Sequence, residues 1–171
     1  GHMSTDNEDG FDPTIVKYES DFDEADKVLT KIVAPERSAV LARTNRQLFV
    51  FQKLCTSRGI KYKFLGKDGF WQQPEVKRLL KLAKESNDQR PANQVLEELI
   101  RQHNLMWLYR GLADLDNDPV RNLNDAVRMS VGKGRVTEFL NYLRRLNYAT
   151  KASKCLTLST VHQIKGGQAD Y

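Results

Sequence analysis

Short apolar runs alternate with amphipathic stretches over the first third of the chain. Strand-like runs occupy residues 14–19, 38–42 and 60–65, and the run SAVLA at 38–42 is apolar enough for a strand with both faces buried. Between these runs, apolar residues at helical spacing predict a short helix that ends at Pro35 and a longer one that ends at Gly59. The order of strands and helices therefore predicts an α/β fold with an open parallel sheet.

The pattern changes to a helical one from about Gly69 to Tyr148. Pro74, Pro91 and Pro119 stand where proline is tolerated, in the first turn of a helix. Apolar residues recur at spacings of three and four, which predicts that each helix buries one face. The four predicted faces are Val76/Leu79/Leu80/Ala83, Val95/Leu96/Leu99/Ile100, Leu105/Leu108/Tyr109/Leu112 and Val136/Phe139/Leu140/Leu143.

Strand character returns at residues 151–160, so we expect the chain to leave the sheet, build a helical subdomain and come back to the sheet. This organisation predicts an α/β domain made of residues 13–68 and 149–171. Residues 69–148 are then an inserted, all-helical subdomain.

The composition is that of an ordinary folded protein with one or two small domains. Of the 171 residues, 40% are apolar and 29% are charged, with 10 glycines and 5 prolines, which excludes collagen-like, low-complexity and wholly disordered classes. No apolar run is long enough to span a bilayer and no secretory leader is present, so we expect a cytoplasmic protein without a membrane partner. Cys55 and Cys155 lie far apart without metal-ligand spacing, so we expect two reduced, buried thiols and no metal site.

Charge is distributed unevenly along the chain. Residues 1–12 begin with GHM, which resembles the scar of a cleaved tag, and continue as a predicted flexible, acidic leader. Residues 1–26 carry nine acidic side chains and one lysine, whereas residues 27–171 carry 26 basic and 13 acidic ones. A basic body of this kind favours polyanions, nucleic acid above all, through neutralisation of phosphates. The alternative is that lysine and arginine merely solvate the outer faces of helices.

Polar residues follow two of the predicted strands, at the edge where a parallel sheet binds its ligands. One cluster is RTN at 43–45, and the other is TVHQIKGGQ at 160–168. Arginine binds phosphate through two parallel hydrogen bonds, threonine and histidine bind backbone phosphates, and a glycine pair lets peptide N–H groups approach an anion. Structural interpretations stay open: an exposed charge at Arg43, a structural hydrogen bond at His162 and a plain turn at the glycine pair.

Three motifs in these segments resemble those of the UvrD/Rep/PcrA-type superfamily 1 DNA helicases. Residues 40–45, VLARTN, look like motif IV of that family, and residues 158–168, LSTVHQIKGGQ, look like its motif V. Between them, GIKY at 59–62 and the later LG, F and EVK resemble the stretch that follows motif IV. The resemblance covers residues 14–171. It implies the second RecA-like domain of such a helicase, truncated at its C-terminus, with residues 69–148 as its helical subdomain.

The resemblance implies that three residues bind nucleotide. Arg43 would reach the triphosphate across an interdomain cleft and is the candidate catalytic residue, while Gly166 and Gln168 would lie beside the nucleotide, with Gln168 near the ribose. The cofactor so implied is ATP with Mg²⁺, and the other wall of its site is the first RecA-like domain of the same parent chain. Three positions depart from the family. Ala42 stands where an aromatic residue often stacks on adenine, and Gly167-Gln168 replaces the usual Leu-Glu. The resulting Gly-Gly form resembles that of phage-type members.

The resemblance also implies a surface for single-stranded DNA. Thr160 and His162 would contact DNA phosphates, and Lys165 would couple the DNA site to the nucleotide site. Phe70 and Lys77 are further candidates for the surface that faces the strand. The Phe70 ring has two interpretations: it stacks on a base, or it packs at the junction with the helical subdomain.

The function that the resemblance implies is that of a fragment of an ATP-dependent DNA helicase that moves 3′ to 5′ along single-stranded DNA. The sequence holds no G-x-x-x-x-G-K-[ST] phosphate loop, no Walker B acidic pair and no motif VI, so we expect the fragment alone not to hydrolyse ATP. The parent would be bacterial, or phage-encoded in a bacterial host. Two alternatives stay open: a non-catalytic module that binds single-stranded DNA or a helicase partner, and the helicase-like domain of a RecB-type nuclease complex.

Overall fold

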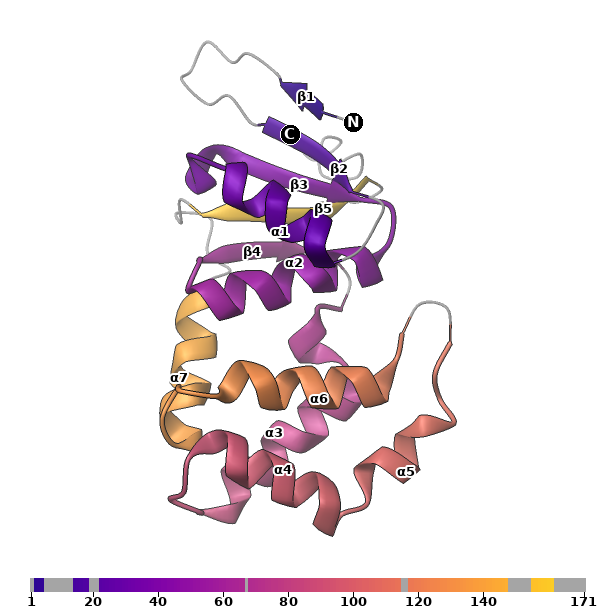
Figure 1. Cartoon of the computed structure of the whole chain (residues 1–171), viewed down its shortest axis with the longest axis vertical. Coiled ribbons are helices and arrows are strands. Elements are labelled where there is room, and N and C mark those ends of the chain that lie inside the picture. Colours follow the sequence, from indigo (N-terminus) through magenta and orange to yellow (C-terminus); the bar gives the residue numbers. More distant parts are fainter. Residues whose placement is uncertain are drawn as a thin grey trace. The chain divides into compact units, whose positions relative to one another are not determined.

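The chain forms two compact units (Figure 1). The first comprises Gly1–Gly69 and Leu146–Tyr171 and is called the sheet unit here, and the second, Phe70–Arg145, is called the helical unit. The structure is a computed structural model that describes residues 2–4, 14–18, 22–66, 68–114, 117–147 and 155–161, with the backbone alone for the first two ranges. That residues 69–148 form an insertion into a RecA-like domain stays a prediction.

The described residues of the sheet unit form a five-stranded, mostly parallel sheet. Its strands are β1 (His2–Ser4), β2 (Thr14–Tyr18), β3 (Ser38–Ala42), β4 (Tyr62–Leu65) and β5 (Leu156–Thr160), in the spatial order β1-β2-β3-β5-β4. Strands β2, β3, β5 and β4 run parallel, and β1 pairs antiparallel with β2. The prediction of a mixed α/β fold with a parallel sheet is therefore confirmed. Strand β5, which comes last in the chain, lies between β3 and β4.

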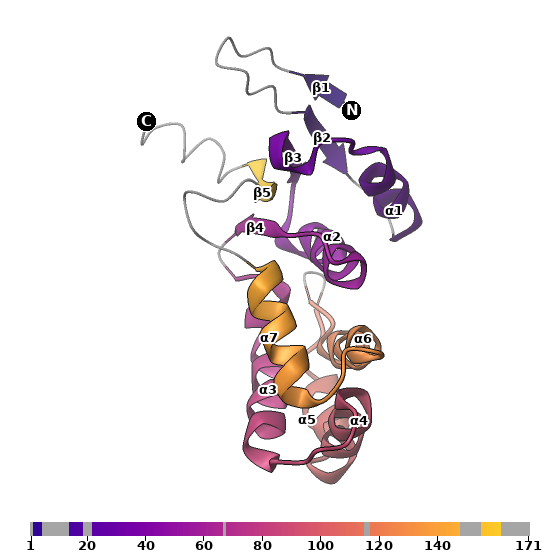
Figure 2. The same cartoon turned by 90° about the vertical axis from the view of Figure 1, so that its left-hand side faces the viewer.

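Two helices cover one face of this sheet. Helices α1 (Phe22–Lys31) and α2 (Asn45–Arg58) contact each other, and Figure 2 places both on the same side of the strands. Tyr62 of β4 identifies the covered face, because its hydroxyl accepts a hydrogen bond of 3.3 Å from the buried Gln52 of α2. Side chains alternate across a strand, so the paired residues of β3 and β5 on the same face complete the core. They include Val40, Leu156 and Leu158, each 0% exposed.

Strand β1 contains His2 and Met3 of the GHM segment and Ser4, the one residue of the predicted flexible leader that the structure describes, so the expected lack of regular structure is wrong for Ser4. These residues pair with the first part of β2, with Met3 opposite Ile15. The outermost strand of a sheet leaves a row of unpaired N–H and C=O groups, and pairing with a further strand satisfies them. Strand β1 does this for β2, and part of it comes from the GHM segment.

The ends of α2 follow from local sequence signals. Gly59 adopts the left-handed conformation, with φ of 70°, and its N–H bonds to the carbonyl oxygen of Cys55. Glycine takes this conformation at little cost because it has no Cβ. The predicted end of the helix at Gly59 is confirmed. A short 3₁₀ helix, η1 (Pro35–Arg37), precedes β3, in agreement with the predicted end of the preceding helix near Pro35.

The helical unit consists of short helices as far as the structure describes it. They are η2 (Phe70–Gln72), α3 (Pro74–Ser86), α4 (Ala92–Gln102), α5 (Leu105–Arg110), α6 (Pro119–Ser130) and α7 (Val136–Leu146), whose last residue belongs to the sheet unit. Pro74 and Pro119 lie in first turns, and α4 begins directly after Pro91. The Asp118 side chain accepts a hydrogen bond of 3.2 Å from the N–H of Arg121 and so caps α6. These predicted helix starts are confirmed.

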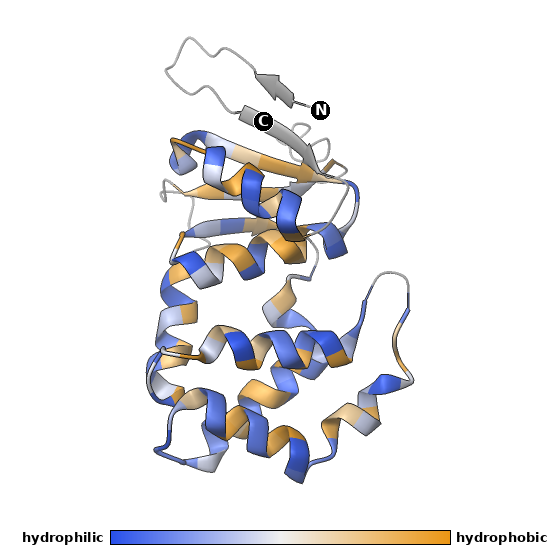
Figure 3. Ribbon diagram, viewed as in Figure 1, coloured by the Kyte–Doolittle hydropathy of each residue, from blue (hydrophilic) through white to orange (hydrophobic). Residues whose placement is uncertain are grey.

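Helices α3, α4 and α6 pack against one another and form the core of the helical unit. Figure 3 shows hydrophobic and hydrophilic residues alternating along them, as expected for helices that bury one face. The buried side chains of this core include Val76, Leu79, Val95, Leu96, Leu123 and Ala126. None of the helices in the described ranges is long and apolar enough to cross a membrane.

Of the apolar face predicted for residues 105–112, Leu105 is buried and Tyr109 is half-buried, and the prediction is wrong for Leu108 and Leu112. Leu105 is 0% exposed, but Leu108 and Leu112 are 45% and 62% exposed. Helix α5 ends at Arg110, so Leu112 lies outside it and the predicted stripe does not form. Helix α5 contacts α4 and α6, yet with six residues it is too short to bury a stripe of two full turns.

Candidate functional site

The carboxyl ends of three parallel strands meet at one edge of the sheet unit. Ala42, the last residue of β3, pairs with Thr160, the last residue of β5. Leu65, the last residue of β4, pairs with Ser159. Ligands of open α/β sheets bind at such an edge, beyond the ends of the strands. The register thus places Thr160, the first residue of the second polar cluster, opposite Ala42, which directly precedes the first cluster.

The backbone that follows β3 is held by a capping box at the start of α2. The Thr44 hydroxyl accepts a hydrogen bond of 3.3 Å from the N–H of Gln47. In return, the Gln47 side-chain oxygen accepts from the N–H groups of Arg43 (3.0 Å) and Thr44 (3.3 Å). These bonds satisfy N–H groups that the helix itself leaves unpaired. They fix the main chain at Arg43, whose side chain is exposed.

Thr160 ends the neighbouring strand in a more enclosed setting. Its side chain is 8% exposed, and its carbonyl oxygen accepts a hydrogen bond of 3.0 Å from the hydroxyl of the fully buried Ser159. Ala42, opposite it, is 2% exposed. The side chains at the adjoining ends of β3 and β5 are therefore small and largely buried.

Two residues at this edge were not singled out from the sequence. The Asn45 side-chain oxygen, in the first turn of α2, is buried and has no hydrogen-bond partner among the described residues. A Cβ on Gly66, which follows β4, would lie 2.9 Å from this oxygen and 2.1 Å from the ring of Phe64. Glycine at position 66 therefore lets β4 end close to α2. The sequence could have pointed to Asn45 through its place in the RTN cluster, and to Gly66 through its place directly after a strand.

Four of the predicted site residues lie outside the described ranges. They are His162, Lys165, Gly166 and Gln168, which follow β5 in the segment that resembles motif V. Of that segment, the structure describes residues 158–161, and these include Thr160. The roles expected for the other four stay predictions.

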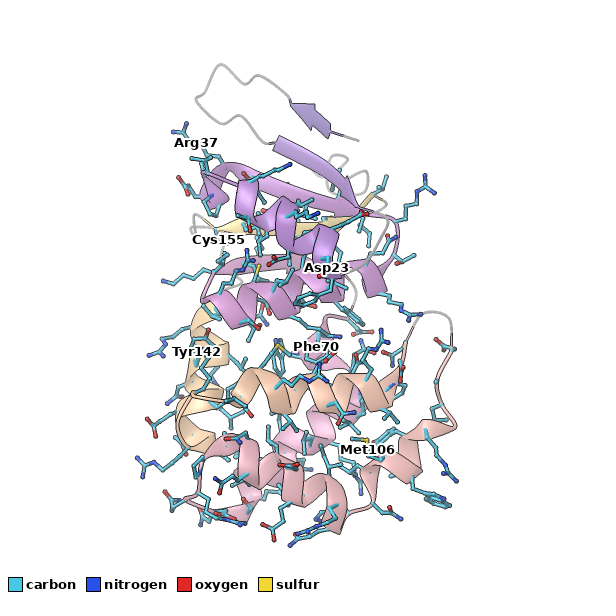
Figure 4. All side chains as sticks on the ribbon, viewed as in Figure 1. Asp23, Arg37, Phe70, Met106, Tyr142 and Cys155 are labelled. Carbon is cyan, nitrogen blue, oxygen red and sulfur yellow. The ribbon has the colours of Figure 1, made fainter. Side chains whose placement is uncertain are left out.

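The remaining two predicted residues, Phe70 and Lys77, belong to the helical unit. The Phe70 side chain, which is labelled in Figure 4, lies in the helical unit and is 0% exposed. Its ring meets that of Trp71 edge-on, with centroids 4.7 Å apart. Trp71 in turn contacts Phe139 of α7 edge-on, at 5.9 Å. The Phe70 ring is thus part of an aromatic cluster and is not presented to a base at the surface. Lys77 is exposed on α3.

Thiol and metal chemistry find no support in the described part of the chain. Burial, with a smaller effect of Cys155, raises the pKa of the Cys55 thiol to about 12, so this thiol is protonated at neutral pH. Burial also raises the pKa of Cys155, against the opposing effect of Lys63 and Lys61. Both are free and buried thiols, as predicted. No group of three or more His, Cys, Asp or Glu side chains in the described ranges is placed to hold a metal ion.

Comparison with known proteins adds no relative. The chain matches no protein-family model, and no curated protein is significantly similar to it.

Proposed function

We propose that this chain is the second RecA-like domain of an ATP-dependent DNA helicase, with the helical unit as its inserted subdomain. The observation that carries the proposal is the pairing of Ala42 with Thr160. Through it, the segments that resemble motifs IV and V leave adjacent parallel strands at the same edge, where this class of sheet binds ligands. The excess of basic over acidic residues in 27–171 supports a polyanionic ligand.

ATP with Mg²⁺ is the cofactor in this proposal, and the residues present fit one side of its site. The Arg43 side chain is exposed at the strand edge, next to the N-terminus of the 14-residue helix α2. A helix N-terminus and a guanidinium both favour phosphate oxygens. Bound ATP supplies the phosphoryl group whose transfer to water drives movement. Arg43 would offset the charge of the triphosphate, and Gly166 and Gln168 would contact the nucleotide, as the resemblance implies.

The rest of the nucleotide site belongs to a partner domain. The sequence holds no phosphate loop or Walker B pair, which are the groups that bind the phosphates and Mg²⁺ in this class of enzyme. In the proposal, the first RecA-like domain of the parent chain supplies them. Closure of the two domains on ATP and their opening after hydrolysis alternate the grip on the strand and give 3′ to 5′ movement.

Single-stranded DNA is the second ligand of the same edge. Thr160 and His162 bind phosphates, and Lys165 couples this contact to the nucleotide. Lys77 is a separate candidate for a phosphate contact, on the helical unit. The buried Phe70 is left out of the DNA site. The competing proposal, a module that binds single strands without catalysis, shares the DNA contacts but not the role of Arg43.

DNA binding can be tested on this chain directly. We expect the affinity for a labelled oligothymidine, measured by fluorescence anisotropy, to fall as salt rises, with a slope of about −0.7 per phosphate contacted. Thr160→Val removes one hydroxyl at nearly constant volume and is expected to weaken binding by roughly tenfold, the loss of one hydrogen bond to a charged group.

Thr157→Val is the matched control, because Thr157 lies on β5 but away from its carboxyl end. It should leave the affinity unchanged. Affinity that does not depend on salt, or equal losses in the two variants, would contradict the proposed DNA site.

A further inference from the structure

Helix α3 carries a stripe of cations on its exposed side. Lys77, Lys81 and Lys84 follow one another at spacings of four and three residues, and Arg78 lies next to them; all four side chains are exposed. Residues three and four apart lie on the same face of a helix. Together these four residues are called the α3 stripe. The buried residues of the same helix, Val76, Leu79 and Ala83, form its other face.

The acidic residues of the helical unit do not neutralise the α3 stripe. Four other arginines of the unit are paired with carboxylates: Arg90 with Asp88 and Glu98, Arg101 with Glu98, Arg128 with Asp125, and Arg135 with Glu138. Among the residues that the structure describes, no ion pair or side-chain hydrogen bond involves any member of the stripe. Its positive charge is therefore available to a ligand.

The acids of α3 itself leave this charge in place. Glu75 is 1% exposed, and one of its carboxylate oxygens accepts hydrogen bonds from the side-chain amides of Asn122 (3.1 Å) and Asn117 (3.2 Å). It thus points into the unit, where it holds the start of α6 against α3. Glu85 is exposed, at the last turn of the helix. One exposed acid against four exposed bases leaves the outer side of α3 strongly positive.

The packing of the helical unit leaves the stripe uncovered by the neighbouring helices α4 and α6. Both contact α3, and Figure 2 shows α3 on the opposite side of the unit from them. The side of α3 turned to those helices is the one that buries Val76 and Leu79. The cations consequently point away from that core.

We propose that the α3 stripe binds the phosphate backbone of single-stranded DNA. This contact is additional to the one at the sheet edge where β3, β4 and β5 end, which is called the strand-end edge here. At a helical rise of about 1.5 Å per residue, the stripe from Lys77 to Lys84 extends over about 10 Å. One strand carries a phosphate about every 3.4 Å of axis in duplex geometry, so this length faces roughly three phosphates. Lysine is a flexible point charge, suited to phosphates rather than to base edges. The stripe therefore holds the strand without reading its sequence.

The test uses the full chain with two lysines reversed, Lys81→Glu and Lys84→Glu, neither of which belongs to the strand-end edge. Because this variant cannot neutralise two of the phosphates, its single-strand affinity near 0.1 M salt should fall at least tenfold, and the slope of log affinity against log salt should shrink by about 1.4. Lys27→Glu with Lys31→Glu is the control, since both are exposed lysines on one helix, α1. The control should change the affinity by less than the stripe variant and leave the slope near that of the parent.

Folding and competing ligands are checked in the same experiment. The unfolding midpoints of both variants should match that of the parent chain, and Lys81→Gln with Lys84→Gln gives a second variant without added acid. Equal slopes for the stripe variants and the parent would overturn the inference. Loss of duplex binding with single-strand binding intact would also overturn the inference. Displacement of the strand by polyglutamate of equal charge would overturn it too, because it would indicate an acidic protein as the ligand.

This inference rests on the proposed function, and the two can fail separately. If the parent chain does not bind the single strand at all, the proposed function fails and the α3 stripe loses its ligand. If the parent chain binds and the stripe variants bind equally well, only the role of α3 is contradicted.

Discussion

Phe70→Ala is expected to lower the free energy of unfolding by about 3–5 kcal/mol, the usual cost of removing a buried aromatic side chain. The Phe70 side chain is 0% exposed and meets Trp71 edge-on, at 4.7 Å between ring centroids. Its removal leaves a cavity and also ends the aromatic pair, which is worth about 0.5–1.5 kcal/mol beyond its buried area. Urea unfolding, followed by circular dichroism, measures the change.

A conservative change at the same position separates packing from DNA binding. Phe70→Leu keeps most of the apolar volume, so the variant should fold, with a smaller loss of stability than Phe70→Ala. Because the ring is buried, we expect its affinity for single-stranded DNA to equal that of the parent chain. The range measured for a stacked base is about 1–3 kcal/mol of binding free energy. If the folded Phe70→Leu variant loses this amount, the ring contacts DNA in addition to packing in the helical unit.

Arg43→Ala is expected to reduce the rate of DNA-stimulated ATP hydrolysis on the order of 10³-fold in the complete reading frame that encodes this chain. An arginine that reaches the transferred phosphoryl group from across a cleft stabilises charge that develops in the transition state. The Arg43 side chain is exposed, so the unfolding midpoint should stay the same. Steady-state hydrolysis with saturating single-stranded DNA gives kcat, and anisotropy gives the DNA affinity, which should not change.

Arg46→Ala is the matched control for this prediction. Arg46 is also exposed and lies in the first turn of α2, three residues further along the chain. Its replacement should leave kcat within a small factor of the parent value. If both variants lose activity equally, general positive charge at the start of α2 is responsible. If Arg43→Ala weakens DNA binding and leaves kcat alone, the assignment of Arg43 to the triphosphate is wrong.

Elements set by local chemistry could be predicted from the sequence. The β3 strand coincides with the apolar run at 38–42, because five apolar or small residues between polar neighbours fit a buried parallel strand. Gly59 ends α2 through its left-handed conformation, and Pro119 begins α6 with the cap from Asp118. Each of these signals acts over a few residues, so no knowledge of the tertiary fold is needed.

Features that depend on contacts distant in sequence could not be predicted in the same way. Residues 105–112 have helical spacing, but only Leu105 of the leucines on the predicted face is buried, because α4 and α6 decide what α5 can cover. The insertion of β5 between β3 and β4 is likewise a long-range pairing. At the candidate site, the cluster around Arg43 could be predicted because it directly follows a strand in the sequence. The side-chain oxygen of Asn45, which has no hydrogen-bond partner among the described residues, could not, because its burial depends on how α2 packs against the sheet.

We propose that this chain forms one wall of an ATP-driven motor on single-stranded DNA. The measurement that tests it most directly is ATP hydrolysis by this chain and by the complete reading frame that encodes it, each with and without single-stranded DNA. We expect DNA-stimulated hydrolysis in the complete protein and none in this chain, whose sequence has no phosphate loop. A complete protein that binds the strand in a salt-dependent manner but does not hydrolyse ATP would contradict the claim.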